Sequence, residues 1–403
     1  MAPDARAAEE FRMQSLGISE GLSQNYAGAL LRDSRGYLWV GTHFGLNRYD
    51  FSRITSYFAT GADGSLPSDN ICEIFESPDG DIWVLCESGT AIYDPLANYF
   101  NEVRYEQGKG LRLRSALIEG KSVLLGGQSQ IYKYDCDSRT LSRLNSTGGS
   151  TDYYTGIHKI NDDNLLLETR WDGVWQYRRS TGEITRYPGI EGMEVSAAYI
   201  DNLGRVWVAV HNQGLTCYDQ SGKMLSHFDR TNSDIGCDIV LDIEAGAFPD
   251  EIWLATDGAG IRSLRTETRE ISLVTHDGGM SVAKIYKDSY GNLYSGTVDD
   301  GVQLFNKIAM HSYHHVPGDP DKRLNPLSFL DTDDGSERFY LSTNGEGIWY
   351  IDKKTGKFHQ IYAGRLMRLL IQAIPSLVMS EITRSPVHII WIEGFSFSPK
   401  VVR

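Results

Sequence analysis

Cysteine is scarce in this sequence, and its arrangement argues against two classes of small stabilised fold. The 403 residues contain five cysteines, an odd number, and no two of them form a CxxC pair. Zinc ribbons and complete disulfide frameworks both need paired cysteines. We therefore expect neither, and we expect most of these thiols to be small buried hydrophobic groups.

Positive charge and long apolar runs are also in short supply. Lys and Arg number 39 against 53 Asp and Glu, which gives a formal net charge of −14. An acidic chain without a basic run gains no electrostatic help towards nucleic-acid phosphates or anionic lipid. Residues 1–17 lack the apolar core of a signal peptide, and the apolar stretch 366–379 is interrupted by Arg368 and Pro375. We predict no nucleic-acid partner and no membrane segment in this chain.

Glycine and aromatic residues, in contrast, are plentiful. The chain has 41 Gly, 22 Tyr and 8 Trp but only 12 Pro, with 41% hydrophobic and 23% charged residues. Tyr and Trp favour strands, and glycine favours the tight turns that join them. This composition predicts a folded, turn-rich, all-β protein.

One short pattern, first seen as "YLWVGT", recurs along the chain at steps of 41 to 46 residues. Each copy has an aromatic or aliphatic residue at its centre, flanked by β-forming residues. Repetition at this period indicates a propeller or a solenoid. The eight centres are Trp39, Trp83, Leu124, Leu166, Trp207, Trp253, Tyr294 and Tyr340.

Each copy belongs to a unit with the same internal order of strands and turns. A first strand leads to a turn such as "DSRG" or "SPDG", the central strand follows, and two further strands close the unit. Four antiparallel strands in 41 to 46 residues form one blade of a propeller, and the recurring tryptophans are expected to pack between blades. The fold class predicted is therefore an all-β β-propeller of four-stranded antiparallel blades. We predict that repeats 1–7 form a seven-bladed ring and that the eighth starts a second propeller. An eight-bladed ring, which fits the bare count of repeats, is the alternative.

The same pattern divides the chain into four segments. We predict a disordered N-terminus over residues 1–10 and a propeller of repeats 1–7 over residues 11–316. The eighth repeat covers 317–363, and 364–403 form an irregular C-terminal tail. The repeat pattern is lost suddenly after residue 363, which favours a truncated or frame-shifted product over a genuine terminal element.

Residues 21–50, "GLSQNYAGALLRDSRGYLWVGTHFGLNRYD", resemble the two-component regulator propeller repeat, and residues 65–95 resemble it less closely. In that family the repeats build the sensor region of hybrid two-component receptors, outside the cytoplasmic membrane. The resemblance implies a periplasmic location, an oligosaccharide or other small ligand, and a homodimer in the full-length receptor. Phosphorelay belongs to kinase and receiver regions, and this sequence carries no motif of either.

Candidate ligand contacts lie on one of the two propeller faces, here called the second face. Its loops precede the first strand of each unit or join the second strand to the third. Aromatic rings can stack on sugar rings, while amide, guanidinium and imidazole groups bond hydroxyls. Ordinary surface or packing between blades is the alternative role for these residues. The candidates are His43, Phe44, Tyr153, Tyr154, Arg170, Trp171, His211 and Asn212.

Two other function classes remain open from the sequence. A propeller lyase or glycosidase could use His43 and His211 with Glu87 as a metal-assisted acid–base site. However, no nucleophile elbow, HExxH or phosphate loop accompanies them, so no catalytic residue, cofactor or metal is assigned. A protein-interaction platform would instead present a flat second face without a pocket.

Overall fold

The computed structural model forms two compact units, Met1–Ile308 and Ala309–Arg403. It describes residues 11–105, 109–144, 146–274, 279–288, 291–307, 315–316, 319–323, 326–331, 338–343, 347–352 and 358–362. The predicted disordered segment 1–10 and the predicted tail 364–403 lie outside these residues. The boundary predicted between residues 316 and 317 stays a prediction.

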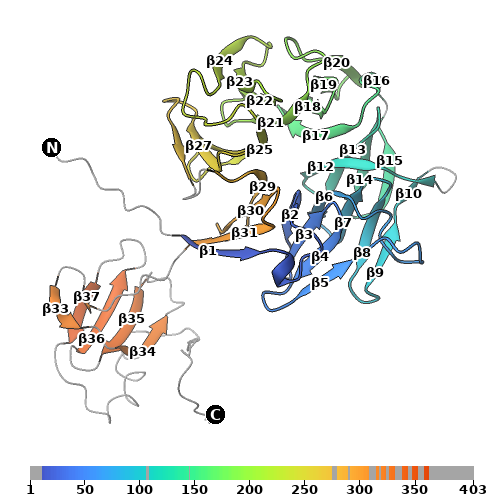
Figure 1. The fold of residues 1–403 in the computed structure, drawn as a ribbon. Coiled ribbons are helices and arrows are strands. Elements are labelled where there is room, and N and C mark those ends of the chain that lie inside the picture. Colours follow the sequence, from blue (N-terminus) through green and yellow to red (C-terminus); the bar gives the residue numbers. More distant parts are fainter. Residues whose placement is uncertain are drawn as a thin grey trace. The chain divides into compact units, whose positions relative to one another are not determined.

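The prediction of an all-β propeller class is confirmed. Within the described residues, the helical content is one 3₁₀ turn, η1 (Ile18–Glu20), and no helix is long and apolar enough to span a bilayer. Everything else that is regular is β-strand, arranged in mainly antiparallel sheets that follow the order of the sequence repeats. Figure 1 shows these sheets in the colours of the chain.

Seven sheets account for most of the described residues of the first unit, and we number them along the chain. Sheets 1 to 3 comprise β2 (Ala29–Arg32), β3 (Leu38–Thr42), β4 (Gly45–Tyr49) and β5 (Ile54–Tyr57); β6 (Ile71–Glu76), β7 (Ile82–Cys86), β8 (Thr90–Asp94) and β9 (Tyr99–Glu102); and β12 (Leu113–Glu119), β13 (Ser122–Gly127), β14 (Ile131–Asp135) and β15 (Thr140–Arg143). The short hairpin β10 (Arg104–Tyr105) and β11 (Lys109–Gly110) lies between sheets 2 and 3 in the chain.

Sheets 4 to 7 repeat this arrangement with two additions. They comprise β17 (Tyr154–Lys159), β18 (Asn164–Thr169), β19 (Val174–Arg178) and β20 (Glu183–Arg186); β21 (Val195–Ile200), β22 (Val206–Val210), β23 (Gly214–Tyr218) and β24 (Met224–Phe228); β25 (Val240–Ala245), β26 (Glu251–Thr256), β27 (Ile261–Arg265) and β28 (Ile271–Leu273); and β29 (Val282–Lys287), β30 (Leu293–Thr297) and β31 (Val302–Lys307). Sheet 4 gains a parallel fifth strand, β16 (Thr147–Gly148), beside β20. Sheet 7 is completed by β1 (Phe11–Leu16), which pairs with β31 from the other end of the unit.

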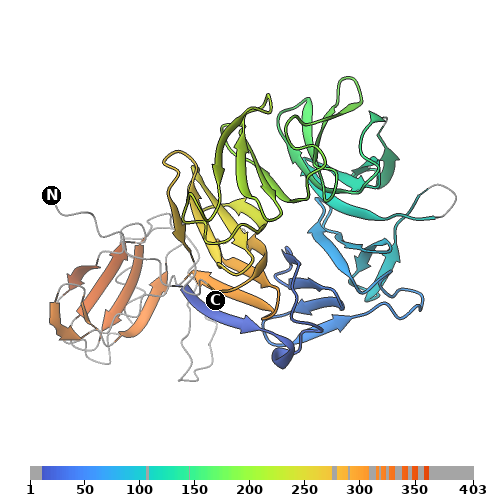
Figure 2. The same ribbon diagram turned by 45° about the horizontal axis from the view of Figure 1, so that its top comes forward.

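The seven sheets of the first unit surround a common axis (Figure 2). The first strand of each sheet contacts the first strand of the next, and β29 of sheet 7 contacts β2 of sheet 1. The first strands therefore line the centre of the unit, and the later strands lie progressively further out. The N-terminal strand β1 closes this ring by supplying the outermost strand of the last sheet.

The core of the first unit lies in the seams between neighbouring sheets. Trp39 of sheet 1 and Trp207 of sheet 5 are each 1% exposed, and each belongs to a cluster that includes residues of the following sheet. In β3, β7 and β22 every residue is buried, because these second strands are covered on both faces. The tryptophans thus pack between blades, as the repeat predicted.

The first strands of sheets 2 to 7 share an irregularity that the repeat pattern did not reveal. Near the start of each strand, the register with the second strand shifts by one residue, as in a β-bulge. The shifts lie between Ile71 and Glu73, Leu113 and Ser115, Tyr154 and Gly156, Val195 and Ala197, Val240 and Asp242, and Val282 and Lys284. The bulge changes which residues of the strand point towards the axis.

The second unit contains one four-stranded sheet among its described residues. Its strands are β34 (Pro326–Asp331), β35 (Arg338–Thr343), β36 (Gly347–Asp352) and β37 (Phe358–Tyr362), and a short pair, β32 (His315–Val316) and β33 (Asp319–Arg323), precedes them. Leu341 and Trp349 form the buried cluster of this sheet. The eighth sequence repeat therefore forms a sheet of the same antiparallel order as the others.

Candidate functional site

The threonine at the end of "LWVGT" shapes the second-face loop between the second and third strands. Thr42 donates from its Oγ1 to the Gly45 carbonyl at 2.8 Å and accepts from the Phe44 amide at 3.0 Å. Equivalent bonds recur at Thr169, Thr256 and Thr297, all of them buried. The hydroxyl satisfies backbone groups that the turn would otherwise leave unpaired. It also directs the intervening side chains outward from the sheet.

The loops of sheet 1 place two rings together at the second face. The rings of Tyr26 and His43 stack with their centroids 3.7 Å apart and an interplanar angle of 16°. Burial lowers the pKa of His43, although the charge of Glu87 acts in the opposite direction. The neighbouring Phe44 remains 57% exposed, with its ring centroid 5.9 Å from that of Phe58. The result is an aromatic surface with one exposed ring.

The loop of sheet 4 adds an exposed tryptophan beside an arginine. Trp171 is 61% exposed, and the guanidinium carbon of Arg170 lies 5.1 Å from the Trp171 ring centroid. Arg170 also pairs with Glu194, at 3.4 Å between Nη2 and Oε1. Burial raises the pKa of Tyr26, and the Arg170 charge opposes this rise. The positive charge of Arg170 thus acts on the Tyr26 phenol in the direction opposite to burial.

Tyr153 and Tyr154 are neighbours in sequence but have different surroundings. The guanidinium carbon of Arg114 lies 4.8 Å from the Tyr153 ring centroid, and Arg114 also donates to the Cys86 and Glu87 carbonyls. Tyr154 is fully buried in the cluster between sheets 3 and 4, and burial raises its pKa to about 12. Its ring offers no surface to a ligand, whereas the partly exposed Tyr153 does.

The loop of sheet 5 carries the last two candidates. The His211 amide donates to the Glu194 carbonyl at 2.9 Å, which ties this loop to the segment before β21. Asn212 is exposed with φ = 57°, a left-handed conformation that asparagine tolerates better than most residues. Asn212 therefore has a conformational role in the turn, and its amide group points away from the core.

The enzyme alternative requires His43, His211 and Glu87 to converge. Across the part of the chain that the structure describes, no three His, Cys, Asp or Glu side chains are placed to hold a metal ion. Glu87 accepts instead from the Asn70 side chain at 3.3 Å, and His43 stacks on Tyr26. These three residues do not form a metal site.

Charged side chains on the first strands form a feature that the sequence analysis missed. Lys284 of β29 pairs with Asp242 of β25 at 3.2 Å, and this carboxylate raises the lysine pKa. Burial raises the pKa values of Glu73 and Glu244, and Lys284 opposes the rise at Glu73. A signal was present, because "ICEIFE", "VLDIEA" and "VAKIYK" each carry two charged residues among apolar ones.

Comparison with known proteins agrees with the repeat assignment. Residues 21–44 match the family model of the two component regulator propeller, which confirms the resemblance seen in the first repeat. Among curated proteins, none matches the chain.

Two solved structures that share the fold are extracellular domains of putative hybrid two component systems from B. thetaiotaomicron. The domain of BT3049 has a TM-score of 0.61 and 19% identity over 88% of this chain and 49% of its own. The domain of BT4673 has a TM-score of 0.57 and 17% identity over 88% of this chain and 47% of its own. The chain thus spans about half the length of these two domains.

A catalytically inactive virginiamycin B lyase from Staphylococcus aureus, solved with quinupristin, is also similar. Its TM-score is 0.55 with 15% identity, over 74% of this chain and 100% of its own. At these identities all three similarities show a shared fold, and the lyase shows that the same fold occurs outside receptors.

Proposed function

We propose that this chain is the ligand-sensing propeller of a two-component receptor and acts outside the cytoplasmic membrane, in the periplasm. The match of residues 21–44 to the two component regulator propeller family supports this proposal. The fold shared with two extracellular domains of hybrid two component systems supports it further. Signalling would follow if the ligand favours one arrangement of a receptor homodimer over another.

The proposed ligand is an oligosaccharide bound at the second face. The observation that carries this choice is the pair of large exposed rings, Trp171 at 61% and Phe44 at 57% exposure, on loops that also present polar groups. An exposed ring can stack on the apolar face of a sugar, and guanidinium or amide groups can bond its hydroxyls. Exposed apolar surface that is contiguous and rimmed by polar groups often marks a binding site.

Seven of the eight candidates remain in this proposed site. Trp171 and Phe44 would stack on the sugar, with His43 and Tyr153 at the edge of the same surface. Arg170, His211 and Asn212 would bond hydroxyl groups. The buried Tyr154 would support the site from below by packing the seam between sheets 3 and 4.

Isothermal titration calorimetry against a panel of defined oligosaccharides tests the proposal. We expect saturable binding of at least one sugar, and Trp171→Ala should weaken it about tenfold, a loss of about 1.4 kcal/mol. Leu203→Ala is the matched control, because Leu203 is 65% exposed but lies in the turn between the first two strands of sheet 5, on the other face. Flat titrations across the panel with folded protein, or equal losses in both variants, would contradict the oligosaccharide proposal.

A further inference from the structure

The seam between sheets 1 and 2 is filled by an arginine. Arg48 of β4 lies opposite Trp39 in the sheet register, and its guanidinium carbon is 5.7 Å from the Trp39 ring centroid. The same guanidinium lies 4.8 Å from the Tyr37 ring and 5.9 Å from the Tyr57 ring, and Arg48 donates to the Tyr93 hydroxyl at 2.8 Å. One partly buried cation therefore occupies an aromatic cage in this seam.

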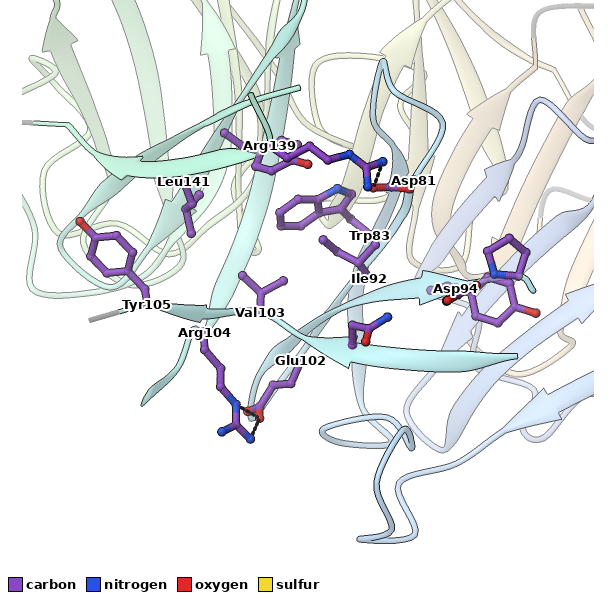
Figure 3. Close-up of a pocket in the computed structure, with 14 residues that line it drawn as sticks. Asp81, Trp83, Ile92, Asp94, Glu102, Val103, Arg104, Tyr105, Arg139 and Leu141 are labelled. Carbon is purple, nitrogen blue, oxygen red and sulfur yellow. Dashed lines mark hydrogen bonds and ion pairs between the residues drawn. The ribbon is translucent and has the colours of Figure 1, made fainter. Parts of the chain in front are cut away.

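The next seam, between sheets 2 and 3, has the same framework with smaller residues. Ile92 lies opposite Trp83 in the register and takes the place of Arg48. Asp81, two residues before Trp83, takes the place of Tyr37, which lies two residues before Trp39. Val103 takes the place of Tyr57. A groove of about 670 Å³ opens here, lined by β7, β8, β9, β10, β14 and β15 (Figure 3). Smaller side chains have left space where the first seam is filled.

Trp83 lines this groove. It lacks the nearby cation that three equivalent tryptophans have, and the hydrogen-bond acceptor for its indole N–H that two of them have. Arg48, Arg205 and Lys287 place a cation within 6 Å of the rings of Trp39, Trp207 and Trp253. Within the described residues no cation lies over Trp83, and its buried Nε1 has no acceptor. The Nε1 atoms of Trp39 and Trp207 donate to Asp33 and Asp201.

The groove also has more negative than positive charge. Three carboxylates (Asp81, Asp94, Glu102) and two guanidinium groups (Arg104, Arg139) line it. Arg139 pairs with Asp81 at 3.0 Å and Arg104 with Glu102 at 2.9 Å, but among the described residues Asp94 has no ion pair. Ile82 and Tyr93 are partners in the register, and Asp81 directly precedes the one while Asp94 directly follows the other. Like charges at such positions repel unless a cation separates them.

None of the eight candidate residues of the second face lines this groove. Its apolar floor consists of Ile92, Val103 and Leu141, which are partly buried against the core of the seam. Figure 3 shows Asp81 and Arg139 beside Trp83, with Asp94 on the neighbouring strand β8 and Val103 nearer β10. An aliphatic stem can lie on such a floor while its charged end reaches the carboxylates.

We propose that this groove binds an arginine side chain presented by a partner polypeptide. The methylene groups would lie on Ile92 and Val103, and the guanidinium would reach the carboxylate of Asp94 beside Asp81. The first seam supplies the template, because there the protein's own arginine fills the equivalent space. A polypeptide is the proposed source, since the occupant of the equivalent space is itself an arginine held on a polypeptide backbone.

The test uses the indole N–H resonance of Trp83 in the full chain, assigned by comparison with Trp83→Phe. Titration with the blocked peptide acetyl-Gly-Arg-Gly-amide should shift this resonance saturably, and acetyl-Gly-Leu-Gly-amide should not. Asp94→Asn should weaken the arginine peptide about tenfold, because it removes a charge-assisted contact. Free arginine should bind more weakly than the peptide.

Ile92→Arg supplies the matched variant, since it restores the residue of the first repeat. It should abolish the response to the arginine peptide and raise the midpoint of unfolding. No saturable shift with the arginine peptide in folded protein would overturn the proposal, and so would undiminished binding in both Ile92→Arg and Asp94→Asn. Equal affinity for free arginine would overturn the polypeptide source. Because the second-face variants do not touch this groove, failure here leaves the oligosaccharide proposal intact.

Discussion

Asp33 and Ser77 occupy the same position in consecutive repeats, at the start of the turn between the first and second strands. The Asp33 carboxylate accepts from Trp39 Nε1 at 2.7 Å and from the Tyr37 and Arg35 amides at 2.8 and 3.1 Å. The Ser77 hydroxyl does not reach the indole of the second repeat and donates to Asp79 instead. Alanine at these two positions therefore removes different sets of hydrogen bonds.

The two substitutions should lower the free energy of unfolding by amounts that differ measurably. Asp33→Ala leaves the indole N–H of Trp39, a residue only 1% exposed, without its charged acceptor. Hydrogen bonds to charged groups contribute about 1.5–3 kcal/mol, and the two turn amides can bond water once the carboxylate is gone. We expect Asp33→Ala to lower the free energy of unfolding by about 3 kcal/mol, and Ser77→Ala by about 0.5–1 kcal/mol.

Urea unfolding, followed by tryptophan fluorescence and circular dichroism, measures both variants. Each is compared with the parent chain, so the contribution of the second unit is the same throughout. Asp201→Ala repeats the experiment in sheet 5, where the Asp201 carboxylate accepts from Trp207 Nε1 at 2.9 Å. If Asp33→Ala and Ser77→Ala differ by less than about 0.5 kcal/mol, the bond to the indole does not stabilise the seam as argued.

Two further predictions concern the axis and the second-face turns. Lys284→Met should destabilise the protein by about 3 kcal/mol at pH 8, because Asp242 and Glu73 lose their cation. The loss should shrink towards pH 4.5, because protonation of Glu73, whose pKa burial already raises, removes its unpaired charge. An unfolding series across pH measures this, and a loss independent of pH would count against it. Gly45→Ala (φ 111°) would place a Cβ 2.8 Å from the Tyr57 carbonyl oxygen, and should lower the melting temperature more than Gly36→Ala (φ 89°), which meets no atom within 4 Å. Equal shifts by calorimetry would contradict the role of this close approach.

The arrangement of strands could be predicted from the sequence because eight copies of the repeat carry the same pattern of strands and turns. Most copies carry an aromatic centre and a turn with glycine, so a unit that departs from the pattern, such as those centred on Leu124 and Leu166, can still be placed by its neighbours. The place of β1 agrees with this pattern, because residues 11–16 precede the first repeat and supply the outermost strand of sheet 7. At the repeat centres and turns, the local sequence preference and the overall propeller fold favour the same structure.

The candidate site was harder to predict, because single residues decide it. Tyr153 and Tyr154 carry the same side chain, but successive residues at the start of a strand point in opposite directions. Tyr154 begins β17 opposite Thr169 and enters the seam, while Tyr153 stays at the surface. No composition or spacing distinguishes the two in advance.

The charges around the axis escaped prediction for a different reason. Glu73, Asp242 and Lys284 each follow a register shift, and that shift is a property of the backbone that has no fixed residue signature. These three residues also lie about 40 to 200 residues apart in the chain. The pattern within one repeat therefore does not predict that they come together.

The pairing of β1 with β31 has a consequence for how the protein is made. Phe11 lies opposite Lys307, so the two halves of the last sheet are separated by nearly the whole length of the first unit. During synthesis β1 leaves the ribosome before β31, and it stays unpaired on both edges while the first six sheets are made. Until its partner arrives, that segment is available to pair with a neighbouring chain, and slow translation would lengthen the period of risk.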